Sequence, residues 1–130
     1  MHIDHINIKA PAELLQREKR FFCEILGLRD GPRPNFGSKG YWLYAGEQPI
    51  VHLSERPLAV PEGQRGHLDH VAFRSRGLEE LLERLDAAGI EYSTAYLADL
   101  RMTQVFLQSP SATGIEVNFI DEPLRTEHRR

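Results

Sequence analysis

The sequence has little cysteine, no long apolar run and no strong excess of charge of either sign. Its single cysteine, Cys23, cannot form an intrachain disulfide, which is typical of a protein in a reducing compartment. No apolar stretch approaches the roughly 18 residues of a membrane-spanning helix, and the charged residues between 11 and 22 exclude the apolar core of a signal peptide. The net charge of −3 gives no electrostatic reason to expect binding to nucleic acid or to an anionic membrane surface. These absences predict a cytoplasmic protein that binds neither nucleic acid nor membrane.

A short pattern occurs twice in the chain. Residues 3–8 read IDHINI and residues 68–73 read LDHVAF, so that His5 and His70 are offset by 65 residues (70 − 5). Residues 49–53 read PIVHL and residues 114–119 read GIEVNF, so that His52 and Glu116 are offset by 64 residues (116 − 52). Two offsets that agree to within one residue predict two superimposable modules. They also suggest that these four side chains converge on one point.

Each half of the chain predicts the same order of elements, in a chain of 130 residues that is long enough to bury one core. Pro11 suits the first turn of a helix, and Gly27 and Gly89 suit left-handed helix ends. We expect helices at about 11–26 and 77–88, and strands at 3–8, 41–45, 49–54, 68–73, 90–96, 103–108 and 114–120. The pattern predicts one domain over 1–121, with modules 1–54 and 67–121, a linker over 55–66 and a flexible tail over 122–130.

The predicted strands separate polar from apolar side chains. Side chains alternate along a strand, so residues two apart share a face. His5, His52, His70 and Glu116 each fall on the face opposite to apolar neighbours, which the helices with their apolar stripes would cover. The four polar side chains are therefore expected on a face that looks into a wet or charged hollow.

In this order and spacing, the two strand patterns, the helix end FFCEILGL at 21–28 and the stretch QVFL at 104–107 resemble the vicinal oxygen chelate superfamily. This superfamily includes glyoxalase I, extradiol dioxygenases, fosfomycin resistance enzymes and bleomycin resistance proteins. The resemblance covers about residues 1–121 and implies an α+β fold of two βαβββ modules. In that glyoxalase-like fold the modules form a curved mixed sheet cup, with helices outside, around one divalent metal ion.

The resemblance also implies roles for the repeated residues. It gives His5, His70 and Glu116 as metal ligands, and His52 falls where glyoxalase I has its first glutamate ligand. The chain departs from the family in this histidine and in the turn at 109–114, which reads SPSATG in place of Asp-Pro-Asp-Gly. Three imidazoles and one carboxylate suit Zn, Ni, Fe, Mn or Co and do not select among them.

The number of ligands bears on the reaction. Four protein ligands leave two positions on an octahedral ion, which suits a small substrate that chelates through two oxygens and a glyoxalase-like lyase or isomerase. Glu116 would then be the catalytic base, or His52 if it does not bind the ion. Without His52 as a ligand, an extradiol-type ring-cleaving dioxygenase becomes the alternative. A metal-free drug-binding protein of the bleomycin resistance kind, or a fosfomycin-type transferase, would use the same fold.

The remaining predictions concern the substrate and the assembly. Loop arginines and aromatic residues near the expected hollow are candidates for substrate binding: Arg33, Phe36, Trp42, Tyr96, Arg101 and Gln104. The loop over 31–40, with three glycines and two prolines, is a candidate lid. The resemblance implies a homodimer, with the cup formed either within one chain or by two chains that exchange modules.

Overall fold

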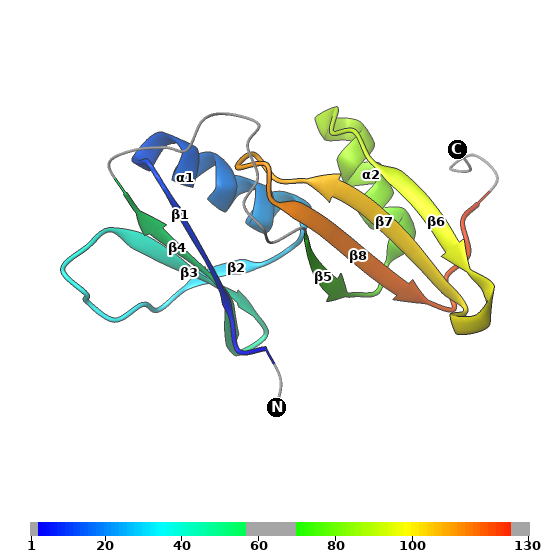
Figure 1. The fold of residues 1–130 in the computed structure, drawn as a ribbon, viewed down its shortest axis with the longest axis horizontal. Helices are drawn as coiled ribbons and strands as arrows, with labels where there is room; N and C mark the ends of the chain where they lie inside the picture. Colours follow the sequence, from blue (N-terminus) through cyan, green and yellow to red (C-terminus); the bar gives the residue numbers. More distant parts are fainter. Residues whose placement is uncertain (1–2, 57–69, 126–130) are drawn as a thin grey trace. The chain divides into compact units, whose positions relative to one another are not determined.

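The structure, a computed structural model, describes residues 3–56 and 70–125. The chain divides into two compact units, unit 1 over Met1–Gln64 and unit 2 over Arg65–Arg130. Each unit contains one helical segment and one four-stranded mixed sheet (Figure 1). The fold is therefore α+β with two βαβββ modules, as the sequence predicted. No helix in the described part of the chain is long and apolar enough to cross a bilayer.

Unit 1 consists of β1 (Ile6–Ala10), α1 (Ala12–Arg20), the π-helical turn η1 (Phe21–Ile25), β2 (Arg29–Gly31), β3 (Gly40–Ala45) and β4 (Gln48–Glu55). The strand order is β1-β4-β3-β2, with β1 parallel to β4 and the other pairs antiparallel. The predicted helix over 11–26 is confirmed in extent, and its last turn widens to a π-helix. Gly27 has a φ of 79°, the left-handed conformation that ends the helix.

Unit 2 repeats this arrangement with β5 (His70–Arg74), α2 (Leu78–Ala88), β6 (Ser93–Leu97), the short 3-10 helix η2 (Ala98–Leu100), β7 (Met102–Gln108) and β8 (Gly114–Ile120). The strand order is β5-β8-β7-β6, and only the β5–β8 pair is parallel. The equivalence of β1 with β5, and of β4 with β8, confirms the two superimposable modules.

In each unit a helix packs against one face of its own sheet and leaves the other face open (Figure 1). The buried residues of unit 1 include Leu15 and Phe22 of the helical segment and Leu43, Val51 and Leu53 of the sheet. Those of unit 2 include four leucines of α2 and alternate residues of β7 and β8: Leu78, Leu81, Leu82, Leu85, Val105, Leu107, Ile115, Val117 and Phe119. Burial of one such side chain contributes about 1.5–3 kcal/mol, so each sheet is held to its helix by apolar contact.

Some predicted boundaries differ from the structure. β1 begins at Ile6 rather than at residue 3, so that His5 precedes the strand. The short strand β2 was not predicted, because three residues are too few to show alternation. β6 begins at Ser93 rather than at 90. Residues 68 and 69 of the predicted strand 68–73, and most of the predicted linker, lie outside the described residues.

The first residue of the predicted flexible tail over 122–130 makes specific contacts within unit 2. The Glu122 carboxylate accepts hydrogen bonds from the backbone N–H groups of Gly77 and Leu78 at 2.9–3.2 Å. Thr103 Oγ1 donates to the Glu122 backbone carbonyl at 2.7 Å. These contacts fix Glu122 at the N-terminus of α2, where Gly77 provides no side-chain cap. The highly charged composition of the tail gave no indication that Glu122 contacts a helix whose first residue is 44 positions away in the sequence.

Candidate metal and substrate site

The strand register gives His52 and Glu116 equivalent positions in the two sheets. His52 on β4 lies opposite Asn7 of β1 and Trp42 of β3. Glu116 on β8 lies opposite Ala72 of β5 and Phe106 of β7. The strand neighbours of both residues, 51 and 53 in one strand and 115 and 117 in the other, are at most 3% exposed. Both side chains therefore lie on the open face of their sheet, as alternation predicted.

Unit 2 brings two of the predicted ligands together. His70 Nε2 lies 3.7 Å from Glu116 Oε1, and the side chains are 48% and 12% exposed. Two ligands that bind one ion at about 2.0–2.2 Å lie about 3.0–3.5 Å apart, so a shift of a few tenths of an ångström suffices for shared binding. The second oxygen, Glu116 Oε2, accepts a hydrogen bond from Asn118 Nδ2 at 2.7 Å. Asn118 thus orients the carboxylate toward His70.

Unit 1 brings the other two predicted ligands together as stacked rings. The His5 and His52 ring centroids lie 3.8 Å apart at an interplanar angle of 10°. Trp42 stacks on the His52 ring at 4.2 Å and 13°. Nitrogen lone pairs lie in the ring planes, so stacked rings do not point them at one atom. Joint binding of an ion requires the His5 ring to tilt, which its position before β1 and its 38% exposure allow.

Hydrogen bonds determine which nitrogen of each unit 1 histidine carries the proton. His5 Nδ1 donates to Asp4 Oδ2 at 2.7 Å, and His52 Nε2 donates to the Pro49 carbonyl oxygen at 3.0 Å. In the neutral rings, His5 Nε2 and His52 Nδ1 keep their lone pairs. Hydrogen bonds of this kind orient metal-binding histidines and raise their basicity. They also give a role to Asp4, whose place in the repeat had no explanation in the sequence.

The environment of His52 favours its neutral form. Burial of the ring lowers the pKa of His52 below its ordinary value near 6.5, and the neighbouring His5 lowers it further. The hydrogen bond to the Pro49 carbonyl raises the pKa, but its effect is smaller than that of burial. A neutral imidazole can bind a metal ion or accept a proton, so both predicted roles of His52 fit its surroundings.

Each unit therefore supplies two donors of the kind that a transition-metal ion takes. Nowhere in the described part of the chain do three or more His, Cys, Asp or Glu side chains form a group that could hold a metal ion. Of the four predicted ligands, two lie in unit 1 and two lie in unit 2. His2, His67 and His128 lie outside the described residues.

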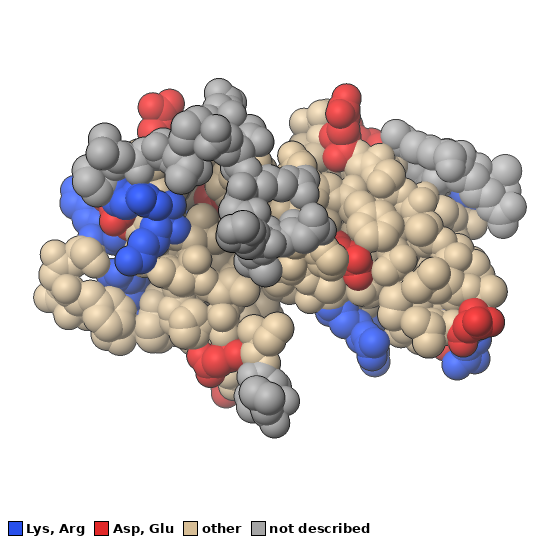
Figure 2. Space-filling view, in the orientation of Figure 1, with Lys and Arg blue, Asp and Glu red and all other residues tan. Residues whose placement is uncertain are grey.

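Three predicted substrate-binding residues lie together on the open side of unit 1. The Arg33 guanidinium lies 4.9 Å from the Phe36 ring centroid, and the Phe36 ring lies 6.1 Å from Trp42. Trp42 in turn stacks on His52. Figure 2 shows lysine and arginine side chains gathered in this part of unit 1, around the ends of β1 and β4 and the loop that leads to β3. The loop arginine, the aromatic residues and the histidines thus form one continuous surface.

The predicted residues of unit 2 are divided between its two faces. Gln104 lies opposite Asn118, on the same face as Glu116. Tyr96 lies opposite the buried Thr103 and therefore on the other face of the sheet from Glu116. Arg101 pairs with Asp121 at 3.2 Å beyond the end of β8, and Asp121 is five residues (121 − 116), or roughly 16 Å along the strand, from Glu116. Of these three residues, only Gln104 lies on the same face as Glu116 and within its reach in unit 2.

Sequence reasoning missed several residues of the site. Asn118 and Phe106 share the open face with Glu116, and Asn7 shares it with His52. Their signal was present in the spacing, because Asn118 follows Glu116 by two positions and Asn7 follows His5 by two.

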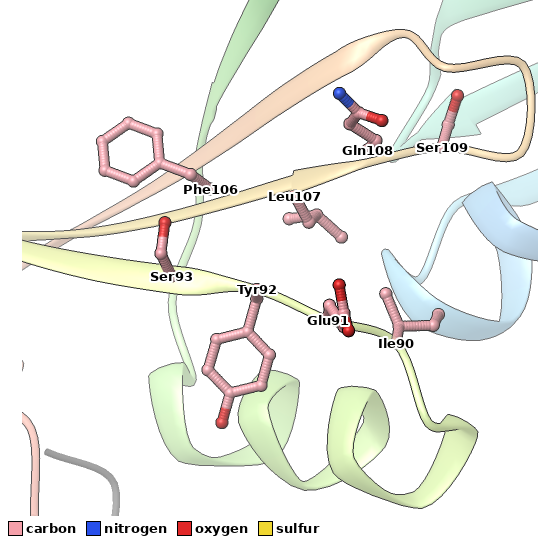
Figure 3. A pocket seen from close by; sticks show the side chains of 8 residues that line it. All are labelled: Ile90, Glu91, Tyr92, Ser93, Phe106, Leu107, Gln108 and Ser109. Atoms are coloured by element: carbon pink, nitrogen blue, oxygen red, sulfur yellow. The ribbon is translucent and has the colours of Figure 1, made fainter. Parts of the chain in front are cut away.

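Unit 2 also contains an open pocket at the start of β6 and the end of β7 (Figure 3). It is lined by Ile90, Glu91, Tyr92, Ser93, Phe106, Leu107, Gln108 and Ser109. None of the four predicted ligands lines it, so it is not the candidate metal site.

Neither a protein-family model nor a curated protein sequence matches this chain. Solved structures match its fold. A protein from Bacillus anthracis described as a member of the glyoxalase family has a TM-score of 0.71 and 23% identity, over 92% of this chain and 95% of its own. The chain has the fold of the vicinal oxygen chelate superfamily.

Two further structures with this vicinal oxygen chelate fold are named for their activity. Lactoylglutathione lyase from Agrobacterium tumefaciens has a TM-score of 0.64 and 17% identity, over 91% of this chain and 92% of its own. A mutant of the fosfomycin resistance protein FosX from Listeria monocytogenes has a TM-score of 0.69 and 15% identity, over 92% of both chains. That mutant is complexed with Mn(II) and 1S,2S-dihydroxypropylphosphonic acid. Identities this low establish the shared fold and not a shared reaction.

Proposed function

We propose that this protein is a metal-dependent enzyme of the vicinal oxygen chelate type. It acts as a glyoxalase-like lyase or isomerase on a small substrate that chelates the ion through two oxygens. The main support for the proposal is the distance of 3.7 Å between His70 and Glu116 in unit 2. At the equivalent positions of unit 1, His5 lies beside His52. The Mn(II) complex of the similarly folded FosX mutant supports the expectation of a divalent ion.

His5, His52, His70 and Glu116 would hold the ion, which is Zn, Ni, Fe, Mn or Co by the chemistry of the donors. When bound, it would supply a Lewis acid that polarises a substrate carbonyl and acidifies the neighbouring C–H bond. Because the site requires donors from both modules, we propose a homodimer with equivalent sites, built within or across chains.

The chain itself supplies the groups that handle the proton. Glu116 is the proposed base, since one of its oxygens faces His70 while the Asn118 amide holds the other. The Asn118 N–H limits the rotation of the carboxylate, which leaves the other oxygen directed toward His70. His52 Nδ1 is the second candidate base, because the Pro49 carbonyl holds the proton on Nε2.

The stacked position of His52 favours one alternative function, that of a dioxygenase. If the ring stays between Trp42 and His5, only His5, His70 and Glu116 bind the ion, and three positions remain open. That set of two histidines and one carboxylate suits an extradiol-type dioxygenase with Fe(II). Oxygen uptake with catechols would distinguish this alternative from the lyase or isomerase.

Elemental analysis of protein purified without a histidine tag tests the proposal. The sample is then reconstituted with each candidate ion and assayed with hemithioacetal and 2-oxo substrates. We expect about one ion per chain and turnover of a substrate of this class. Absence of bound metal and of turnover after reconstitution would reject the enzyme and leave a metal-free binding protein.

His52→Ala separates the two roles of that residue. Loss of the metal together with turnover identifies His52 as a ligand. Retained metal with lost turnover identifies it as the base. His70→Ala is the matched control, because it removes a ligand in either case.

A further inference from the structure

On the open face of unit 1, Asn7, His52 and Trp42 lie side by side across β1, β4 and β3, and we call them the His52 row. A second row of residues lies beside it. The register places Lys9 of β1 opposite Ser54 of β4, and Ser54 opposite Gly40 of β3. Lys9 and Ser54 lie two positions along their strands from Asn7 and His52, so the two rows share a face and are about 6.6–6.8 Å apart. Ser54 Oγ donates to Asn7 Oδ1 at 3.0 Å, which links the rows.

Arg33 occupies the space above Gly40 in this second row. A side chain at position 40 would begin 2.9 Å from Arg33 Nη2 and 3.0 Å from Arg33 Cζ, and it would collide with the Leu53 carbonyl oxygen. The absence of a side chain at Gly40 therefore lets the guanidinium lie on the sheet. Arg33 Nη1 donates to the Ser38 carbonyl oxygen at 2.8 Å, and the Phe36 ring packs against the same guanidinium. These contacts hold the cation over the row.

The two cations of the row have no carboxylate partner in the described part of the chain. Neither Lys9 nor Arg33 takes part in an ion pair there. Arg33 Nε is buried and has no hydrogen-bond partner among these residues. The nearest acidic residue along β4, Glu55, lies opposite the buried Ala10 and thus on the other face. The row combines two unpaired positive charges with a hydroxyl group, beside the candidate ligand His52.

We propose that Lys9, Arg33 and Ser54 form an anion-binding subsite for a distal carboxylate of the substrate. The inference rests on the proposed function and names its substrate class, small acids that carry a second acidic group. The two chelating oxygens would lie at the His52 row, and the second carboxylate would lie one row farther along β4. A guanidinium and an ammonium group both form strong charge-assisted hydrogen bonds to a carboxylate.

The test compares 2-oxoglutarate with 2-oxopentanoate. Both have the same 2-oxo acid end and the same chain length, and only 2-oxoglutarate has the distal carboxylate. Trp42 is the single tryptophan and stacks on His52, so its fluorescence reports binding on this face. We expect 2-oxoglutarate to bind about tenfold more tightly, since one charge-assisted hydrogen bond accounts for that ratio. Equal affinities in the unaltered protein would overturn the proposal.

Arg33→Met and Lys9→Met should each lower the affinity for 2-oxoglutarate about tenfold and leave that for 2-oxopentanoate unchanged. Arg29→Met is the matched control, because Arg29 lies on the same sheet but over the Tyr44 ring, away from the Lys9 row. It should change neither affinity, and an equal loss in Arg29→Met would show a nonspecific charge effect and reject the subsite. If Arg33→Met does not fold, Arg33→Lys should retain most of the preference and Lys9→Met carries the test.

Measurement with metal-loaded and with chelator-treated protein separates this inference from the proposed function. A preference for 2-oxoglutarate in protein that binds no metal supports the subsite and rejects the metal enzyme. Metal binding without that preference rejects the subsite and leaves the metal enzyme standing. Metal content of Arg33→Met should equal that of the unaltered protein, because Arg33 is not a proposed ligand.

Discussion

At the scale of single residues, the packing around His52 determines its protonation and therefore its possible roles. Its ring lies between Trp42 and His5, and its Nε2 is hydrogen-bonded to the Pro49 carbonyl oxygen. The two rings shield part of it from water, and the carbonyl fixes its tautomer. A histidine held in this way remains uncharged at neutral pH, which is the state that both a ligand and a base require.

The pKa of His52 should therefore lie below about 6.5, as a proton NMR titration of the metal-free protein can measure. Trp42→Ala should raise this pKa by exposing the ring, and His5→Ala should raise it by removing the imidazole whose electrostatic effect lowers it. Arg101→Met, in the other unit, should leave it unchanged. A His52 that titrates above about 6.5 would contradict the packing described here.

This shift also predicts how stability depends on pH. Because the folded-state pKa is depressed, the unfolded chain takes up the proton of His52 first as the pH falls below about 6.5. The contribution of His52 to the free energy of unfolding should thus fall as the pH is lowered through the folded-state pKa. His52→Gln should reduce this part of the pH dependence in urea denaturation series.

Asn118 should act as a positioning residue for Glu116. Asn118→Ala removes the 2.7 Å hydrogen bond to Glu116 Oε2, and we expect it to weaken metal affinity about 10–100-fold. Gln104→Ala is the control, since Gln104 lies opposite Asn118 on the same face and has no role in holding Glu116. Competition with a coloured chelator measures both affinities. If Asn118→Ala and the unaltered protein have equal metal affinities, Asn118 does not position Glu116 for metal binding.

At the scale of elements, α2 depends on a residue that follows the last strand of its unit. Gly77 and Leu78 at its N-terminus have no local side-chain cap, and the Glu122 carboxylate accepts their N–H groups. The negative charge also complements the helix dipole. Through these hydrogen bonds, Glu122 links the segment after β8 to the N-terminus of α2.

Glu122→Gln should therefore lower the free energy of unfolding by about 1 kcal/mol, through loss of the charged cap. Glu83→Gln is the control, because Glu83 is exposed in the middle of α2, and its effect should stay within about 0.5 kcal/mol. Chemical denaturation followed by circular dichroism measures both variants. Equal stabilities of the two would show that the cap contributes little.

At the scale of the whole molecule, duplication divides the candidate site into two half-sites. Unit 1 offers two imidazoles, and unit 2 offers an imidazole and a carboxylate. Two ligands seldom retain a transition-metal ion, whereas three or four do. Metal binding would thus report on the association of the two modules.

The double variants His5→Ala/His52→Ala and His70→Ala/Glu116→Ala should each lose the metal, as elemental analysis after reconstitution can show. Mixing the two variants after partial unfolding should restore metal only if two chains share each site. A double variant that binds metal with unchanged affinity would place the site within a single unit and contradict the proposal.

Much of this architecture follows from local pattern. The repeated offsets, the strand alternation and the glycines after each helix predicted two superimposable modules and the open faces of His52 and Glu116, and the family resemblance implied the βαβββ order of each module. These signals are reliable because helix and strand periods come from the geometry of the backbone itself. The face of Tyr96 escaped prediction, because it depends on the register of β6 against β7. A shift of one residue turns every side chain to the other face.

The sequence alone determined the helices, every strand except β2 and the four candidate ligands, because local periodicity and a repeated pattern can be read without any distance in space. Folding had to supply the pairs that act: His5 on His52, His70 beside Glu116, Arg33 over Gly40 and Glu122 on α2. All four contacts bring together different segments of the chain, and only strand register and helix packing determine such distances.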